Sequence, residues 1–284
     1  MNFIVRCQRG SVLIMVLWVL ALLTMIVAYY ANQVRILRNA AQYTFSSIQG
    51  EQAALSVLRL VANHLSEVSV EDSTEDDTLT IVPQRVYLTH VGSLDVRFEV
   101  ENEAGKIDLN RVEEDFLREF LRYLLGEENP KKADTICDGI LDWRDPDKLT
   151  HINGAEDETY EEKDPPYHAA NGPFKTVDEL LLVNGVTSRL FYGPIESPNI
   201  PEGWKGGLKD LFTIYNGKSS VNPDLAPAPI RNFLEERADL GFNGKASVWL
   251  LKISAASRRY RIYWEKIGNA PGYKIVFWTE GVGH

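Results

Sequence analysis

A run of acidic side chains in the middle of the chain is the segment best suited to chemistry. Between Asp142 and Asp164, nine carboxylates stand against three basic residues. Asp145 and Asp147 flank a proline, and three consecutive acidic residues follow Gly154. Calcium takes about six to eight oxygen atoms from carboxylates, carbonyls and amides on irregular chain. The segment therefore suits a calcium site, and a solvated acidic face is the alternative interpretation.

Other catalytic or metal-binding patterns are missing from the sequence. The acidic run lacks the spacing of an EF-hand, and the five histidines show no zinc-ligand spacing. Asn216 to Ser219 resembles the end of a phosphate-binding loop, but Phe212 replaces the glycine that such a loop requires. We therefore expect no enzymatic activity. Cys137 lies among apolar residues at helical spacing, which predicts a buried structural thiol.

A second candidate for binding is the segment Val177 to Leu190, which is similar to a helix-hairpin-helix. Such hairpins bind nucleic-acid phosphates through backbone amides at a helix start. Acidic neighbours work against phosphate binding, so packing of apolar residues is the favoured interpretation. DNA capture stays as the alternative.

The N-terminus predicts both a membrane anchor and a cleavage site. Ser11 to Ala31 is an uncharged run of 21 residues after Arg6 and Arg9. A helix of that length spans a bilayer, and the preceding cations keep the N-terminus cytoplasmic. The processing mark Gly10-Ser11 precedes the apolar run, whereas a secretory signal is cut after its apolar core. The order is typical of a prepilin leader covering residues 1–10.

The elements that must position these residues can be predicted from periodicity. One helix should run from Ser11 to about Leu65, with an apolar stripe on its second half. Strand patterns occupy 79–89 and 94–101, helical spacing extends from 112 to about 190, and strand patterns return at the C-terminal end, at 246–254, 260–266 and 273–279. This order predicts an α+β fold in which a helical domain is inserted between strands of one antiparallel sheet. We divide the chain into the leader 1–10, the membrane half of the helix 11–34, a first sheet part 35–106, the insert 107–232 and a second sheet part 233–284.

The net charge of the chain indicates which kinds of partner it can bind. The chain has a formal net charge of −10, which becomes −12 after loss of Arg6 and Arg9 with the leader. Such a surface suits cations and basic partners and disfavours nucleic acid.

Several motifs in order resemble one family, the type II secretion minor pseudopilin called general secretion pathway protein K. The resemblance covers nearly the whole chain. The motifs are Gln8-Arg9-Gly10, Glu103 to Asn110, Asp142 to Asp147, Gly154 to Asp157 with Tyr160, Asn171 to Phe174, and Asp178 to Val186.

The resemblance implies a pilin-like fold and a non-catalytic assembly role. A family member would be cleaved by prepilin peptidase and N-methylated, with a single-pass anchor in the inner membrane and a periplasmic body. It would cap the pseudopilus tip with minor pseudopilins I and J above the major pseudopilin shaft, and would help to start assembly and limit length during exoprotein export. Met15 fits that position, because shaft pilins resemble one another in carrying glutamate at the fifth mature residue. The alternative is a DNA- or exoprotein-binding minor pilin of a type IV pilus-like fibre.

The resemblance also implies calcium within the insert. We expect its ligands among Asp142, Asp145, Asp147, Glu156, Asp157, Asp164 and Asn171.

Overall fold

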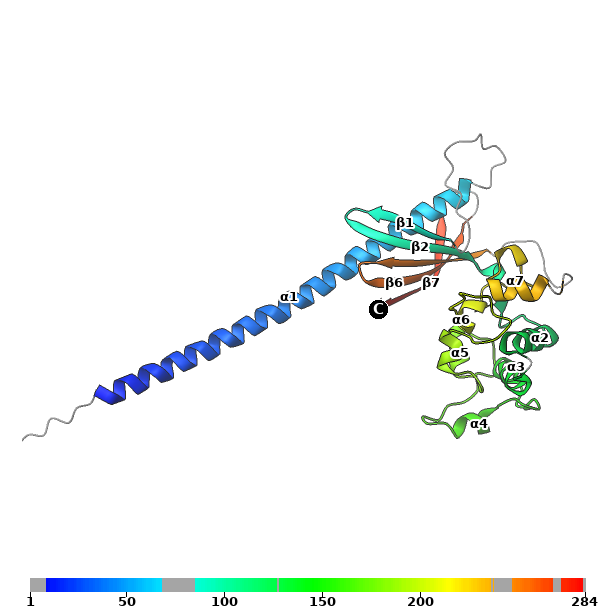
Figure 1. Ribbon diagram of the computed structural model, residues 1–284, viewed down its shortest axis with the longest axis horizontal. Coiled ribbons are helices and arrows are strands. Elements are labelled where there is room, and N and C mark those ends of the chain that lie inside the picture. The colour runs from blue at the N-terminus through cyan, green and yellow to red at the C-terminus, as the bar shows by residue number, and fades with distance from the viewer. Residues whose placement is uncertain are drawn as a thin grey trace, which may run out of the picture.

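The computed structural model describes residues 9–67, 85–126, 128–235, 237, 247–267 and 272–282. Its dominant element is one helix, α1 (Arg9–Glu67), which extends far beyond the rest of the molecule (Figure 1). The N-terminal part of α1 is long and apolar enough to cross a membrane, and its side chains from Val12 to Phe45 are exposed. Leader residues 1–8 and the predicted strand residues 79–84 lie outside the described residues.

A five-stranded antiparallel sheet is built from both ends of the chain. The strands are β1 (Val86–Val91), β2 (Leu94–Asn102), β5 (Val248–Ala255), β6 (Arg258–Lys266) and β7 (Tyr273–Val282), and they lie side by side in that order. Because β2 pairs with β5, two strands from before the insert adjoin three from after it. The predicted α+β fold, with a long helix on an antiparallel sheet and a set of additional helices, is confirmed.

The second half of α1 packs on one face of this sheet. Val57, Leu58 and Val61 are buried against apolar side chains of β2, β5 and β6. The sheet covers only part of the predicted apolar stripe of α1. The side chains of Phe45 and Ile48, which belong to that stripe, remain 63% and 53% exposed. The covered part begins near Gly50, where the phenol of Tyr260 leaves no room for a larger residue.

The inserted region between β2 and β5 has its own apolar core, made by residues between Ile107 and Leu234. Its longest helices, α2 (Glu114–Leu125) and α3 (Pro130–Arg144), pack against each other. The shorter elements are α4 (Asp157–Glu161), α5 (Ser188–Tyr192), α6 (Leu208–Leu211), α7 (Ala228–Glu235), the 3-10 turns η1 (Glu103–Gly105), η2 (Val177–Leu181) and η3 (Pro223–Leu225), and the parallel pair β3 (Ile107–Asp108) and β4 (Phe212–Thr213).

Helical spacing overstated the helix content of this region. Residues 162–176 contain no helix, although the apolar pattern had predicted helix from 112 to about 190. Pro165, Pro166 and Pro173 explain the difference, since proline lacks the N–H that a helix interior requires.

A buried ion-pair cluster joins the insert to the sheet. Lys106, 2% exposed, lies 2.8 Å from Glu101 and 2.9 Å from Glu103, and Lys252 of β5 pairs with the same Glu101. Burial removes the charges of Glu101 and Lys106 from water, which costs free energy. The ion pairs that these residues make offset this cost.

Candidate metal centre

The centre of the acidic segment is Asp142, in the last turn of α3. Its carboxylate is completely buried and accepts hydrogen bonds from the backbone N–H groups of Ala155, at 2.7 Å, and His151, at 3.2 Å. The His151 ring nitrogen Nδ1 contacts the same carboxylate, and this contact raises the pKa of His151. Gly154 is required for this approach, because a Cβ atom there would lie 1.8 Å from Asp142 Oδ2. Asp142 thereby holds the loop that connects α3 to α4.

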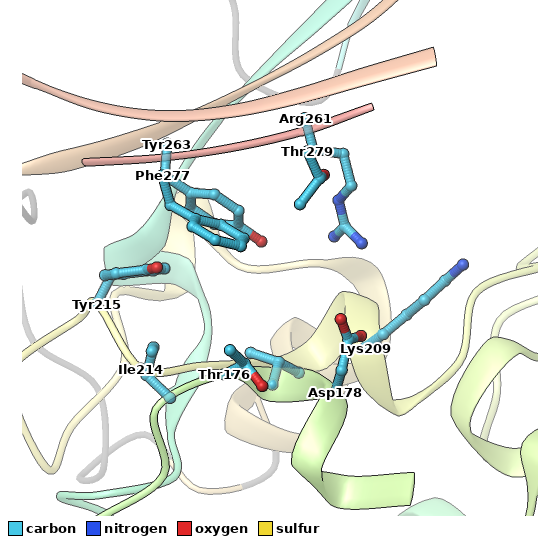
Figure 2. A pocket seen from close by; sticks show the side chains of 10 residues that line it. Thr176, Asp178, Lys209, Ile214, Tyr215, Arg261, Tyr263, Phe277 and Thr279 are labelled. Atoms are coloured by element: carbon cyan, nitrogen blue, oxygen red, sulfur yellow. The ribbon is translucent and has the colours of Figure 1, made fainter. Parts of the chain in front are cut away.

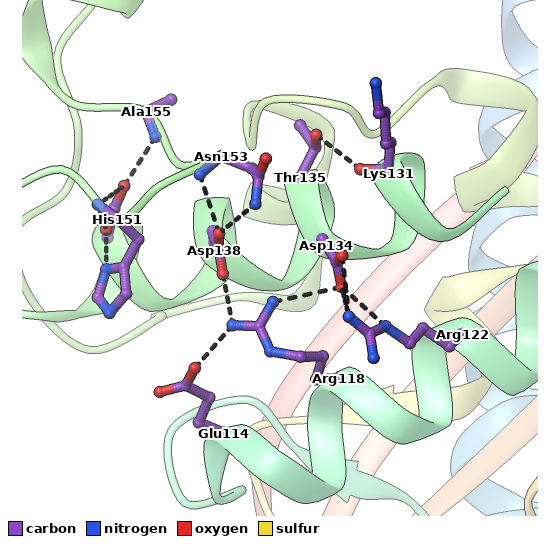
Figure 3. Close-up of polar contacts among 11 residues, drawn as sticks. Glu114, Arg118, Arg122, Lys131, Asp134, Thr135, Asp138, His151, Asn153 and Ala155 are labelled. Atoms are coloured by element: carbon purple, nitrogen blue, oxygen red, sulfur yellow. Dashed lines mark hydrogen bonds and ion pairs between the residues drawn. The ribbon is translucent and has the colours of Figure 1, made fainter.

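A second aspartate one turn earlier holds the same loop. Asp138 Oδ2 accepts hydrogen bonds from the backbone and the side-chain amide of Asn153, both at 3.0 Å, and its Oδ1 contacts Arg118 of α2 at 2.6 Å (Figure 3). Residues four apart lie on one face of a helix, so the pair Asp138 and Asp142 presents two carboxylates to one loop. The loop is consequently anchored at Asn153 and again at Ala155.

Several buried side-chain oxygen atoms of the acidic segment, and one of Asn171, have no hydrogen-bond partner among the described residues. Ligand atoms of Asp142, Asp145 and His151 all lie within 4.8 Å of one another. Among the described residues, no partner is found for buried Asp145 Oδ1, for either carboxylate oxygen of Glu156, or for Asn171 Oδ1. Unpartnered buried oxygens are costly, and a bound cation is one ligand that would satisfy them.

Electrostatics at this cluster favour a cation. Burial, followed by repulsion from Asp142 and Asp145, raises the pKa of Glu156 to about 7. Burial and the neighbouring Asp147 and Asp142 also raise the pKa of Asp145. A bound cation would neutralise this repulsion and satisfy the free oxygens. The residues present therefore fit a divalent cation that prefers oxygen, with Asp142, Asp145, Glu156 and Asn171 as donors.

Three other predicted ligands have different contacts in this structure. Asp147 Oδ1 accepts a hydrogen bond from the Leu149 N–H at 2.8 Å. Asp157 lies 2.9 Å from Lys148, and this pairing is the main cause of the lowered pKa of Asp157. Asp164 is exposed. Their part in a metal site stays a prediction.

Sequence reasoning missed two members of this arrangement. Neither His151, whose spacing fits no zinc site, nor Asp138 is among the ligands predicted from the sequence. The spacing of Asp138 and Asp142 on one helix face was the available signal for the anchored loop.

The segment that resembles a helix-hairpin-helix contributes to the core of the insert. Leu180, Leu190 and Phe191 are buried, and the two short helical turns η2 and α5 each have five residues. Glu179 accepts hydrogen bonds from the Thr176 N–H at 2.9 Å and from the Trp143 ring N–H at 3.2 Å. These side chains pack and cap the fold, which favours the structural interpretation.

The residues of the predicted cleavage site lie at the start of α1. Gly10 and Ser11 belong to the helix, and Met15 is 69% exposed. Cleavage after Gly10 stays a prediction. Cys137 is fully buried, and burial raises the pKa of its thiol to about 12, as expected for an unreactive cysteine.

Comparison with known proteins relates the chain to one protein family. Residues 100–192 match the family model described as type II secretion system (T2SS), protein K. The chain is 26% identical over 196 residues to the type II secretion system protein K of Klebsiella pneumoniae, which covers 65% of this chain and 60% of that protein. It is 30% identical over 198 residues to the Pseudomonas aeruginosa protein of the same name, which covers 63% of this chain and 58% of that protein. The chain thus spans about 60% of the length of these relatives.

A solved structure shares the fold. The match is a chain of the crystal structure of the GspK-GspI-GspJ complex from the enterotoxigenic Escherichia coli type 2 secretion system. It has a TM-score of 0.59 at 13% identity and covers 86% of this chain and 99% of that chain. Together with the family model and the relatives, it confirms the resemblance seen in the sequence motifs.

Proposed function

Since the chain belongs to the type II secretion system protein K family, a family of structural pseudopilins, we propose that it caps the pseudopilus tip as a minor pseudopilin. The observation that carries the proposal is the combination of one 59-residue helix with an exposed apolar half, a sheet on its other half, and a large domain beside that sheet (Figure 1). The exposed half would lie in the membrane or among other pseudopilin helices. The body would lie in the periplasm.

The proposed partners are minor pseudopilins I and J. The similar solved chain comes from a GspK-GspI-GspJ complex, and this chain leaves the apolar residues Leu37, Phe45 and Ile48 of α1 uncovered. Packing of these side chains against neighbouring helices would remove them from water. The insert would prevent another subunit from stacking above the tip, which would limit the length of the shaft during exoprotein export.

The test is complementation of a strain that lacks this gene. The wild-type gene should restore secretion and short pseudopili, and an empty plasmid should leave secretion reduced. Equal secretion and equal pseudopilus length in both strains would contradict the proposal. DNA retained on filters in a salt-sensitive manner would instead support the DNA-binding alternative.

Cleavage of the leader is tested on protein made with and without prepilin peptidase. We expect the protein extracted from membranes containing prepilin peptidase to begin at Ser11, with or without an added methyl group. Intact mass and N-terminal sequencing report this directly, and the same protein made without the peptidase is the control. A chain that retains Met1 to Gly10 in the presence of the peptidase would contradict a pilin-class assembly role.

We also propose that calcium binds at Asp142, Asp145, Glu156 and Asn171. When bound, the ion would supply charge neutralisation and hold the loop between α3 and α4. Calcium at about 100 times its Kd should stabilise the fold by about 2.7 kcal/mol, raising Tm by several degrees over chelator. Glu156→Gln should reduce this shift, whereas the exposed neighbour Glu158→Gln should retain it. Identical melting curves of the wild type in calcium and chelator would exclude the site.

A further inference from the structure

The sheet face opposite α1 carries a cluster of cations. Cross-strand pairing places Arg97 of β2, Ser254 of β5 and Arg259 of β6 in one row. Lys252 and Arg261 are cross-strand neighbours in the next row, two residues along each strand. Side chains two apart on a strand share a face, so all of these point away from α1. Four cations therefore lie together on a chain whose net charge is −10.

The insert turns this face into a cleft. A cavity of about 290 Å³ lies between the sheet and α6, which contributes Lys209 and Asp210 to its lining. Val86, which is 54% exposed and pairs with Glu99 across the strands, adds an apolar side chain to this face. A pocket of this size is at the lower end of the range for ligand sites.

The lining of the cleft holds more cations than carboxylates, with five basic residues against Glu99 and Asp210. Asp210 accepts a hydrogen bond from the Gly207 N–H at 3.1 Å and lies 3.8 Å from Lys252. Lys252 also pairs with Glu101, which already holds a buried lysine. Glu99 is the other acid in the lining, and burial disfavours its charged form by raising its pKa. The two carboxylates of the lining are thus outnumbered by its basic residues.

Arg261 is the cation with the clearest need for a ligand. No hydrogen-bond partner for its buried Nε, and no ion pair of its guanidinium, is found within the described part of the chain. Figure 2, a close-up of a second cavity that Arg261 also lines, shows its guanidinium reaching from the sheet into the space above Lys209 and Asp178. Lys209 lies over the Tyr192 ring, 4.8 Å from its centre. A buried guanidinium N–H without an acceptor is costly, and a bound carboxylate is its best geometric match.

We propose that this cleft binds an acidic peptide segment of a partner protein, with carboxylates on Arg261 and Arg97 and an apolar side chain beside Val86. The exposed apolar side chain of Val86 beside these cations favours such a segment over a hydrated inorganic anion. Because the cleft lies between sheet and insert, the bound segment would contact both parts of the molecule. This inference does not depend on the metal site.

The proposal is tested by fluorescence anisotropy with the full chain in neutral detergent. The probe is a fluorescein-labelled octapeptide of alternating aspartate and leucine, and its control has asparagine in place of aspartate. We expect the aspartate peptide to bind and the asparagine peptide to bind at least about tenfold more weakly, a factor equivalent to ~1.4 kcal/mol. Equal binding of the two peptides would overturn the proposal.

Variants locate the site. Arg261→Gln and Arg97→Gln should each weaken binding by about tenfold, as expected for loss of a charge-assisted hydrogen bond. Arg97 is exposed, so its variant tests the site even if the buried Arg261 variant folds poorly. The exposed Lys131→Gln, on α3 of the insert, is the matched control and should bind like the wild type. Unchanged binding by Arg97→Gln would contradict the assignment.

Competition separates a peptide site from a general anion site. Inorganic phosphate at the ionic strength of a sodium chloride control should displace no more peptide than the chloride does. Displacement by phosphate at concentrations similar to the peptide would overturn the choice of an acidic peptide.

Discussion

At the scale of single residues, aspartates carry the organisation of the insert. Asp138 and Asp142 sit on one face of α3, and each accepts backbone N–H groups from the loop before α4. The acidic composition of this segment could be predicted from the sequence. The roles of its members could not, because Asp145 and Asp147 are two residues apart yet Asp145 keeps a free buried oxygen whereas Asp147 caps a turn. These differences in role depend on where the loop after α3 comes back to the aspartates, ten or more residues later in the sequence. Local residue patterns do not determine that position.

The buried pair at the junction predicts a pH dependence of stability. Burial acts to raise the pKa of Glu101, but Lys106 and Lys252 outweigh it and hold this pKa to about 2, below the ordinary value of 4.5. A carboxyl with a lowered folded-state pKa adds stability above the unfolded value and loses it as pH falls toward the folded value. We therefore expect the free energy of unfolding to fall by roughly 3 kcal/mol on this account between about pH 4.5 and pH 2.

Denaturant titrations at several pH values measure this contribution. Glu101→Gln should be less stable at neutral pH and should lose less stability than the wild type on acidification. The exposed Glu113→Gln should follow the wild-type curve. If Glu101→Gln and the wild type lose stability in parallel, the ion pairs do not contribute as the structure indicates.

At the scale of elements, α1 is the part best predicted from sequence. Its start, its length and its single apolar stripe all follow from periodicity, and the strands after the insert begin and end within a few residues of their patterns. The extent of the sheet contact was not predictable, because Phe45 and Leu58 have the same character in sequence. Only the position of the sheet distinguishes the exposed Phe45 from the buried Leu58.

The contact between α1 and the sheet predicts an asymmetry between two leucines of one helix. Leu58 is fully buried and Leu60 is 37% exposed. Leu58→Ala should destabilise the body by about 2–5 kcal/mol, since the change leaves a cavity, whereas Leu60→Ala should cost under about 1 kcal/mol. Both changes alter helix propensity equally, so the difference in free energy of unfolding reports packing alone. Equal losses would contradict the observed orientation of α1.

At the scale of the whole molecule, the insert behaves as an addition to a complete sheet. Asn102 and Trp249 are cross-strand partners, so the two ends of the insert leave and re-enter the sheet side by side. The predicted insertion of a domain into a sheet rested on strand patterns on both sides of helical spacing. The boundaries at 107 and 232 were harder to predict, because the residues at the junction show no regular spacing of apolar side chains.

Excision of the insert tests this organisation. Joining Asn102 to Trp249 through an Asn-Gly turn should leave a cooperative unfolding transition and a β-rich far-UV spectrum, since that turn suits an antiparallel hairpin. Joining Asn102 to Leu250 through the same turn is the control, because a one-residue slip points the strand's side chains to the wrong face. Cooperative melting of the control but not of the first variant would contradict the register.

The pairing of β2 with β5 also dictates an order of events during synthesis. As the chain emerges from its N-terminus, α1 and the β1–β2 hairpin appear early, but β5 and β6, which complete the burial of Leu58, come last. The insert can fold meanwhile, because its core draws only on residues made before β5. An interrupted chain would therefore carry a finished insert on an unfinished sheet with an apolar helix uncovered. The apolar surface that chaperones recognise on such an incomplete chain would lie on α1 and the unfinished sheet, and not on the insert.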